Sequence, residues 1–171
     1  WGYLHAAAKP SHMASVNDTY DEWERYGYTD TAVYDKQRLE AHLQSKIYHG
    51  ALWENNAGHL HPLNYALGLA RAAKEAGVRI FEDSRVLTLD KGPTVSVKTD
   101  KGSVRAKFLV AAGNAYLGNM IPKLYRRVMP VGSFIVATEP LGAERASALI
   151  ANNDAVSCTN NIVDYYRLSS D

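Results

Sequence analysis

The chain has 171 residues, of which 46% are hydrophobic and 22% are charged, a composition typical of soluble globular proteins. No apolar run approaches the ~20 residues of a membrane helix, so we expect no membrane span. Nineteen Lys and Arg residues against eighteen Asp and Glu residues leave a formal charge of +1, and because the basic residues are scattered along the sequence, we expect no nucleic-acid partner.

The only cysteine is Cys158, so the chain can form no internal disulfide, which fits a reducing, cytoplasmic compartment. No catalytic signature surrounds Cys158, and we interpret it as a small buried apolar residue rather than a nucleophile. The chain opens at Trp1 without a targeting peptide and stops at Asp171 inside a strand pattern. We therefore expect an internal piece of a longer protein.

The first third of the chain predicts two strands and two helices. Residues 2–8 are apolar and predict a buried strand, and a helix follows from Ser11 to Gly27, with apolar residues at helical spacing. A second, short helix is expected from Asp35, because Leu39 and Leu43 share one face. Residues 48–53 resemble another strand.

The middle third begins with a regular helix from Pro62, whose stripe of small residues would let it pack closely on a sheet until Gly77 ends it. Residues 78–81 predict a short strand. Antiparallel strands are then predicted at residues 86–89, 95–97 and 103–107. The last two are joined by a turn at residues 100–102 and form a hairpin that faces solvent.

The apolar run Phe108–Ala112 ends at Gly113 and is typical of a strand buried on both faces of a parallel sheet. Ligands of doubly wound sheets lie beyond the carboxyl ends of the strands, so Ala111, Ala112 and Gly113 are expected where a dinucleotide would pass. Residues 128–138 then predict a long strand and residues 142–150 a short helix. Two closing strands are expected at residues 155–158 and 162–168.

Three blocks of the sequence resemble the D-amino-acid-oxidase superfamily of FAD-dependent oxidoreductases. Residues 58–86 are similar to its Pro-led, Ala-rich helix followed by a glycine, a strand and a valine, and residues 97–118 resemble its polar hairpin and AAG strand. Residues 129–142 and 161–171 look like substrate-domain strands of gamma-glutamylputrescine oxidases.

The resemblance implies an α/β fold in which part of an FAD-binding doubly wound domain is interleaved with part of an antiparallel-sheet substrate domain. Residues 1–60 and 121–171 would belong to the substrate domain and residues 61–120 to the FAD-binding domain. The implied enzyme oxidises a carbon–nitrogen bond of a small-molecule amine, such as a gamma-glutamyl-linked diamine, and passes the electrons through FAD to molecular oxygen. Hydrogen peroxide is then released.

The chain departs from the family in one respect that bears on the cofactor. Its members begin with a strand and a GxGxxG turn that receives the FAD pyrophosphate, and no such motif occurs here, since Gly113 and Gly118 have the wrong spacing. We therefore expect the chain by itself to bind FAD poorly or not at all. The hypothesis requires Gly113 to end a strand at a sheet edge.

The resemblance also implies roles for individual residues. Val86 matches a position whose backbone meets the adenine end of FAD, and Ala111, Ala112 and Gly113 match the strand end that lines the cofactor. In each case tight core packing is the alternative interpretation.

Tyr165 corresponds to an active-site tyrosine of amino-acid oxidases. Tyr166 is the other candidate, because successive side chains of a strand point to opposite faces. Packing in the core is the alternative for both tyrosines, and we interpret Arg167 as a surface residue.

His59 and His61 lie two residues apart, but no cluster of acidic or cysteine ligands accompanies them, so we predict no metal site. His59 is a candidate to line the edge of the flavin, and His61 to cap the helix that follows.

Two other functions remain open. One is a related oxidase or dehydrogenase acting on sarcosine, glycine or a D-amino acid. The other, from a different class, is a cofactor-free binding module that keeps the fold without catalysis.

Overall fold

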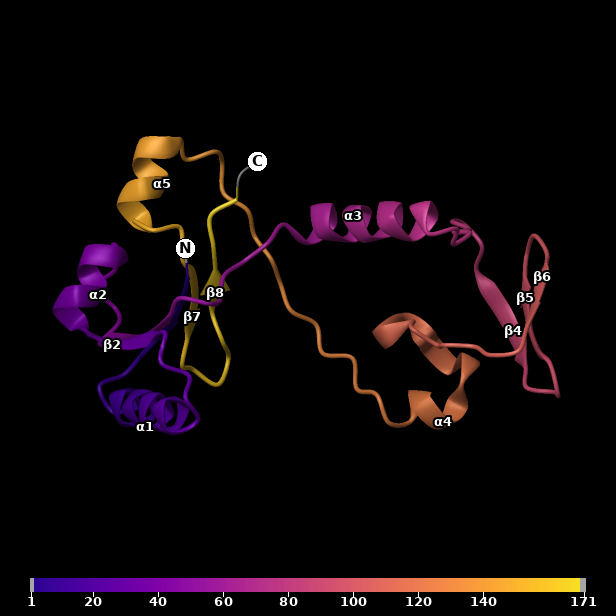
Figure 1. Ribbon diagram of the computed structural model, residues 1–171, viewed down its shortest axis with the longest axis horizontal. Helices are drawn as coiled ribbons and strands as arrows, with labels where there is room; N and C mark the ends of the chain where they lie inside the picture. Colours follow the sequence, from indigo (N-terminus) through magenta and orange to yellow (C-terminus); the bar gives the residue numbers. More distant parts are fainter. Residues whose placement is uncertain (1, 170–171) are drawn as a thin grey trace. The chain divides into compact units, whose positions relative to one another are not determined.

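The computed structural model describes residues 2–169 and has a mixed α/β architecture (Figure 1). The chain divides into two units by its internal contacts. Unit 1 comprises residues 1–67 and 137–171, and unit 2 comprises residues 68–136. This division does not assign either unit to a cofactor or a substrate, so the predicted domain roles stay predictions.

Unit 1 is built on a five-stranded mixed sheet in the order β2-β3-β1-β7-β8. Its strands are β1 (Tyr3–Ala6), β2 (Thr31–Asp35), β3 (Gly50–Glu54), β7 (Ala155–Cys158) and β8 (Tyr165–Tyr166). The central strand, β1, pairs antiparallel with β3 and parallel with β7, where Leu4 lies opposite Val156. Since β7 comes from the end of the chain, the first and last thirds of the sequence fold together.

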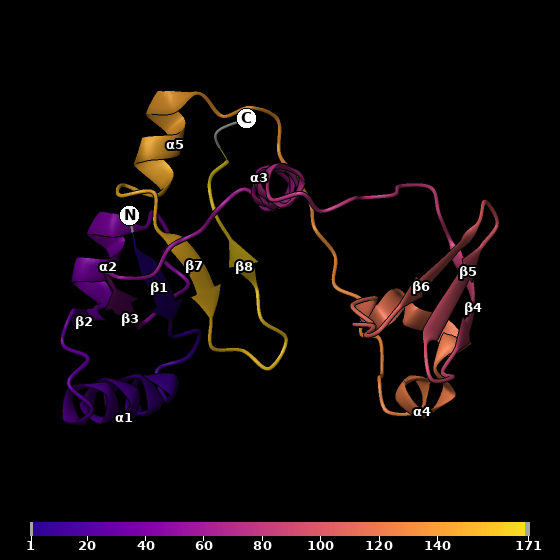
Figure 2. The ribbon, with the colours of Figure 1, turned by 45° about the vertical axis from the view of Figure 1, so that its right-hand side comes forward.

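Helices cover both faces of this sheet (Figure 2). On one face, α1 (His12–Arg25) packs Val16 against Leu52 and Ala7. On the other, α2 (Lys36–His42) contributes Leu39 to the main core. That core also contains Leu4, Ala6, Tyr34, Leu43, Tyr48, Ala51, Ile150, Val156 and Cys158. The two clusters bury the sheet on both sides, and apolar burial of this kind is the main favourable term in folding.

The predicted elements of unit 1 are largely confirmed. Helix α1 ends before Gly27, which takes the left-handed conformation (φ 79°) typical of the residue after a helix. Ser11 occupies the N-cap position of α1, although its side chain makes no capping hydrogen bond. Asp35 does cap α2, because its Oδ1 accepts a hydrogen bond from the backbone N–H of Arg38 at 2.7 Å. The predicted C-terminal helix is also present, as α5 (Ala143–Leu149).

Unit 2 consists of an antiparallel meander and short helices. The meander pairs β4 (Val86–Asp90), β5 (Val95–Thr99) and β6 (Ser103–Ala106), with a bulge between Val86 and Thr88. The 3-10 helix η1 (Asn114–Met120) and α4 (Pro122–Tyr125) follow. The expected hairpin at residues 95–107 is therefore confirmed.

The Pro-led helix is confirmed as α3 (Pro62–Glu75), which runs across the boundary between the two units. None of its residues is buried, so the described chain does not place a sheet against its small-residue stripe.

Three predicted strands are wrong for this structure. Residues 78–81, 108–112 and 128–138 form no strand. A strand requires a neighbour that accepts and donates its backbone hydrogen bonds, and within residues 2–169 none of the three segments has a ladder partner. The strand expected at residues 162–168 shortens to the two residues of β8 for the same reason, since only Tyr165 and Tyr166 pair with β7.

Unit 2 also lacks a core of its own. Among its residues only Ile121 is buried, while Phe108, Val110 and Phe134 are each more than four-fifths exposed. The energy that stabilises a domain comes mainly from removing such surface from water. Unit 1 therefore carries most of the described chain's folding stability.

Among residues 2–169, every helix is too short or too polar to span a bilayer.

Candidate functional site

The two candidate tyrosines lie on β8, the edge strand of the unit 1 sheet. The hydroxyl of Tyr166 donates a hydrogen bond to the hydroxyl of Tyr48 at 3.2 Å, and Tyr48 is buried in the main core. Burial raises the pKa of Tyr166 well above its usual range, and the hydrogen bond to Tyr48 adds to this effect. Tyr166 is 38% exposed, so its hydroxyl contacts the core while the residue as a whole stays partly open to solvent.

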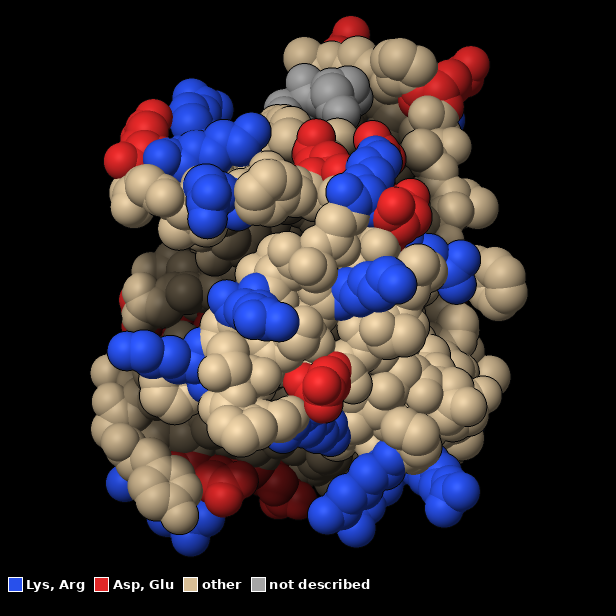
Figure 3. Space-filling view, turned by 90° about the vertical axis from the view of Figure 1, so that its right-hand side faces the viewer, with Lys and Arg blue, Asp and Glu red and all other residues tan. Residues whose placement is uncertain are grey.

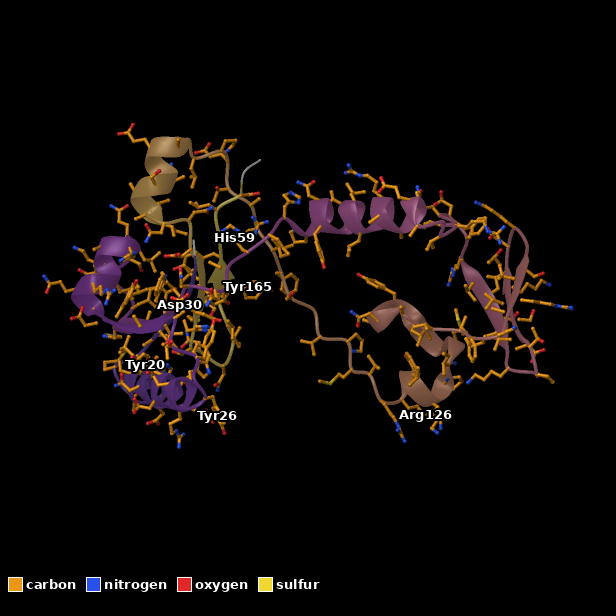
Figure 4. The ribbon with its side chains drawn as sticks, viewed as in Figure 1. Tyr20, Tyr26, Asp30, His59, Arg126 and Tyr165 are labelled. Carbon is orange, nitrogen blue, oxygen red and sulfur yellow. The ribbon has the colours of Figure 1, made fainter. Side chains whose placement is uncertain are left out.

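Tyr165 points to the opposite face of the strand, as alternation requires. Tyr165 is 57% exposed, and its side chain makes no hydrogen bond to any residue from 2 to 169. Figure 4 labels it on β8. The structure therefore separates the two tyrosines: the Tyr166 hydroxyl bonds to the core, and the Tyr165 hydroxyl has no hydrogen-bond partner among residues 2–169.

The turn between β7 and β8 fixes the start of this edge strand. Cys158 is buried, and its Sγ accepts a hydrogen bond from the backbone N–H of Asp164 at 3.2 Å. The Cys158 N–H also donates to the Asp164 carbonyl at 2.9 Å. The interpretation of Cys158 as a buried apolar residue is confirmed, and its thiol stabilises the turn that positions Tyr165.

The two histidines ahead of α3 have separate contacts. His59 Nε2 lies 2.9 Å from the carbonyl oxygen of Asn153, which ties this segment to the loop before β7 (Figure 4). The Nδ1 of His61 accepts a hydrogen bond from the backbone N–H of Asn64 at 3.2 Å, so His61 caps α3 as predicted. In the described part of the chain, no group of three or more His, Cys, Asp or Glu residues could hold a metal ion.

A second polar cluster on unit 1 was missed by sequence reasoning. The hydroxyl of Tyr28 donates to Glu54 Oε1 at 2.8 Å, and Glu54 Oε2 lies 3.4 Å from His5 Nε2. The hydrogen bond to Glu54 raises the pKa of Tyr28. Three separate segments supply these residues, and no local motif links them. The pairing of β1 with β3 brings His5 near Glu54, and the pairing of β2 with β3, in which Thr31 lies opposite Glu54, brings the segment of Tyr28 to the same place.

Asp154 was also missed. It is fully buried at the start of β7, and neither of its carboxylate oxygens has a hydrogen-bond partner among residues 2–169. The Nε1 of Trp53 is likewise buried without a partner. Trp53 Nε1 and Asp154 Oδ1 both lie close to Gly2. A Cβ placed on that glycine would be 2.8 Å from Trp53 Nε1 and 3.2 Å from Asp154 Oδ1. A side chain at position 2 would not fit there.

The predicted cofactor residues lie in unit 2. Val86 begins β4, and Ala111 lines an open hollow beside β4 and β5. Gly113 does not end a strand but precedes η1, and a Cβ placed on it would lie 3.2 Å from the Leu117 side chain. The space beside Gly113 is thus taken up by the chain's own next turn. As they stand, Val86, Ala111, Ala112 and Gly113 do not form a site that fits FAD.

Gly113 does not lie at a sheet edge, where the predicted flavin site required it to be. The class of protein therefore rests on similarity rather than on this segment. In fold, the chain is similar to two enzymes of known structure. It matches L-proline dehydrogenase from P. horikoshii with a TM-score of 0.73 at 18% identity, covering 99% of this chain and 46% of that one. It matches glycine oxidase from Geobacillus kaustophilus with a TM-score of 0.65 at 19% identity, covering 72% of this chain and 34% of that one.

The family model for FAD-dependent oxidoreductases, named DAO, matches residues 1–171. The chain therefore belongs to the DAO family of FAD-dependent oxidoreductases, which confirms the resemblance and the α/β fold class.

Two curated relatives are similar over 99% of this chain. The probable oxidoreductase OrdL of Haemophilus influenzae is 42% identical, and the gamma-glutamylputrescine oxidoreductase of Escherichia coli is 38% identical. The chain covers 41% of the first relative's length and 40% of the second's. It thus spans about two-fifths of the length of the curated relatives it matches.

Proposed function

We propose that the whole protein to which this chain belongs is an FAD-dependent amine oxidoreductase that oxidises a carbon–nitrogen bond of gamma-glutamylputrescine. Molecular oxygen is the electron acceptor, and hydrogen peroxide is released. The support is the family match over the full chain together with the 38% identity to an Escherichia coli protein named for that substrate. When bound, FAD would supply the redox chemistry, and the protein's part is to hold and orient the amine.

Within this chain, the proposal is supported by the different surroundings of Tyr165 and Tyr166 on β8. Tyr166 is anchored through its hydroxyl to buried Tyr48, so it has no free donor for a ligand. Tyr165, on the same strand, is 57% exposed, and its hydroxyl has no hydrogen-bond partner among residues 2–169. We assign Tyr165 as the residue that contacts the substrate and Tyr166 as the residue that fixes the strand. A role for His59 at the site stays a prediction.

The two tyrosines should respond differently to loss of the hydroxyl in the whole enzyme. We expect Tyr165→Phe to lower kcat/KM by ~10-fold or more, since a hydrogen bond to a charged group contributes about 1.5–3 kcal/mol. Tyr166→Phe should change kcat/KM less than ~3-fold but lower the free energy of unfolding by about 1 kcal/mol, because the Tyr48 hydroxyl loses its partner. Steady-state kinetics and denaturant melts would measure both.

The reverse ranking, with Tyr166→Phe giving the larger kinetic loss, would reject the assignment of Tyr165. The Tyr48→Phe variant serves as the matched control. It removes the same hydrogen bond from the core side, so its stability should fall with that of Tyr166→Phe while its kcat/KM stays near wild type.

The proposed substrate can be tested with a chimera. This chain would replace the matching stretch of the Escherichia coli gamma-glutamylputrescine oxidoreductase, to which it is 38% identical over 171 residues. Peroxide formation with gamma-glutamylputrescine, and little with sarcosine, glycine or D-amino acids, is the expected result. Turnover of sarcosine or glycine but not of gamma-glutamylputrescine would reject gamma-glutamylputrescine as the substrate. It would favour the alternative of a related oxidase that acts on sarcosine or glycine.

A further inference from the structure

A polar contact joins the first and last parts of the chain next to the turn that leads into β8. The hydroxyl oxygen of Thr159, the first residue after β7, lies 2.6 Å from Nδ1 of His12, the first residue of α1. The same oxygen accepts a hydrogen bond from the backbone N–H of Ala8 at 3.1 Å. The turn and α1 lie at the same end of the unit 1 sheet (Figure 2). Thr159 therefore ties this turn to two segments from the start of the chain.

The two contacts of Thr159 fix the direction of its hydroxyl proton. A hydroxyl has one proton to donate and two lone pairs that accept. Because the Ala8 N–H occupies one lone pair, the proton is free to point at His12, where Nδ1 accepts it when the ring hydrogen is on Nε2. A distance of 2.6 Å is at the short end of hydrogen-bond lengths. A valine at position 159 would keep the shape of this side chain but lose both contacts.

Strand β8 has few other restraints on its position. It is two residues long and lies at the edge of the sheet, so β7 is its only neighbouring strand among the described residues. In the turn between them Ile162 is largely exposed, so packing does little to hold the segment. The turn is held at its two ends, by Thr159 at the start and by the contacts of Asp164 with Cys158 at the end. Since Tyr165 directly follows Asp164, the placement of the turn sets the placement of Tyr165.

We propose that Thr159 and His12 are positioning residues for Tyr165. Their contact fixes the β7–β8 turn against α1, and with it the point at which the Tyr165 hydroxyl meets the amine substrate. The bond between Tyr166 and Tyr48 holds the other face of β8 to the core. The inference rests on the proposed function for the role of Tyr165, but the placement of β8 can be measured without any assay of activity.

Hydrogen exchange of the chain tests the placement of β8. In Thr159→Val, peptides that cover residues 159–166 should exchange about 2- to 10-fold faster, the change expected for loss of one hydrogen bond. His12→Leu should have the same effect. Thr159→Ser keeps the hydroxyl and should restore the wild-type rate, and His12→Asn should do so as well, because its amide oxygen can replace Nδ1 as the acceptor. Unchanged exchange in Thr159→Val would overturn the proposal.

Two further Thr→Val changes separate this effect from general damage. Thr19→Val also removes a hydrogen bond, which the Thr19 hydroxyl donates to the Ser15 carbonyl at 2.9 Å within α1. Thr88→Val alters β4 of unit 2, where Thr88 is exposed on a surface rich in charged side chains (Figure 3). Both variants should exchange like the wild type at residues 159–166. Equal acceleration in either of them would show that the effect is not specific to Thr159 and would overturn the proposal.

Kinetics of the chimera with the Escherichia coli relative test whether Thr159 acts through Tyr165. Thr159→Val should lower kcat/KM for gamma-glutamylputrescine by about 2- to 10-fold, again the effect of one hydrogen bond. The same change made together with Tyr165→Phe should lower kcat/KM by less than ~1.5-fold further, because residues that act as a unit are not additive. An equal fold-loss with and without Tyr165→Phe would refute the positioning role.

Failure of the proposed function gives a different result. If Tyr165→Phe by itself leaves kcat/KM unchanged, the assignment of Tyr165 to the substrate is wrong. Faster exchange of residues 159–166 in Thr159→Val, with rescue by Thr159→Ser, would still show that Thr159 and His12 place β8.

Discussion

Replacing Gly50 by alanine should destabilise unit 1 by about 3 kcal/mol or more, as the sum of strain and overpacking. Gly50 begins β3 with φ at 152°, a conformation that side-chain-bearing residues rarely adopt. A Cβ there would lie 2.6 Å from the Tyr34 carbonyl oxygen and 2.7 Å from the Met13 sulfur. Because the Tyr34 oxygen belongs to the neighbouring strand, relief requires the sheet or helix α1 to shift.

Gly58→Ala is the control for this change. Gly58 has no atom within 4 Å of its Cβ position and does not have a positive φ. The free energy of unfolding of the variant should therefore lie within ~0.5 kcal/mol of the wild-type value. Urea denaturation followed by tryptophan fluorescence measures both, since Trp23 and Trp53 lie in unit 1. Equal stability of the two variants would show that β2, β3 and α1 do not pack as described.

The second large effect is a contrast between the two units of the isolated chain. Backbone amides of the unit 1 core strands should exchange at least ~1000-fold more slowly than those of residues 86–130, because local stability follows buried apolar contact. Leu4, Leu52 and Val156 are almost fully buried, whereas only Ile121 is buried in unit 2. Hydrogen exchange followed by mass spectrometry would resolve the two groups of peptides.

Trypsin gives an independent measure of the same contrast. The first cuts should fall after basic residues of unit 2, such as Lys91 and Arg105, while Arg25 is spared although it is exposed in α1. Its helix is held to the sheet through Val16 and Leu52. Early cleavage at Arg25, or uniform protection across the whole chain, would contradict the account of where the core lies.

Much of unit 1 could be predicted from the sequence because its signals are local and its partners are present. The helical spacing of Val16 and Tyr20, the Asp35 cap and the apolar run of β1 all act within a few residues of one another. The described chain then supplies every strand that β1 needs. Local preference and tertiary contacts therefore agree there.

The failures in unit 2 have a common cause. The run Phe108–Ala112 has a clear preference for a buried strand, yet a strand is defined by its neighbours, and the described chain offers none. Residues 78–81 and 128–138 fail in the same way. The sequence pattern reports what a segment is suited to form, and the missing ladder decides what it forms here.

The candidate site was predicted in part. Alternation along β8 indicated that Tyr165 and Tyr166 face opposite ways, but not which of the two meets the core. That choice depends on Tyr48, which lies 118 residues earlier in the sequence. The contact of Glu54 with His5 and Tyr28 was invisible for the same reason. Long-range pairing places these side chains, and no spacing in the sequence records it.

The flavin content of the chimera with the Escherichia coli relative tests the central claim most directly. We expect the chimera to purify with bound FAD and to show flavin absorbance, while the isolated chain retains no flavin after excess FAD is removed by gel filtration. A chimera that folds cooperatively but takes up no FAD would contradict the assignment of this chain to a flavin-dependent enzyme.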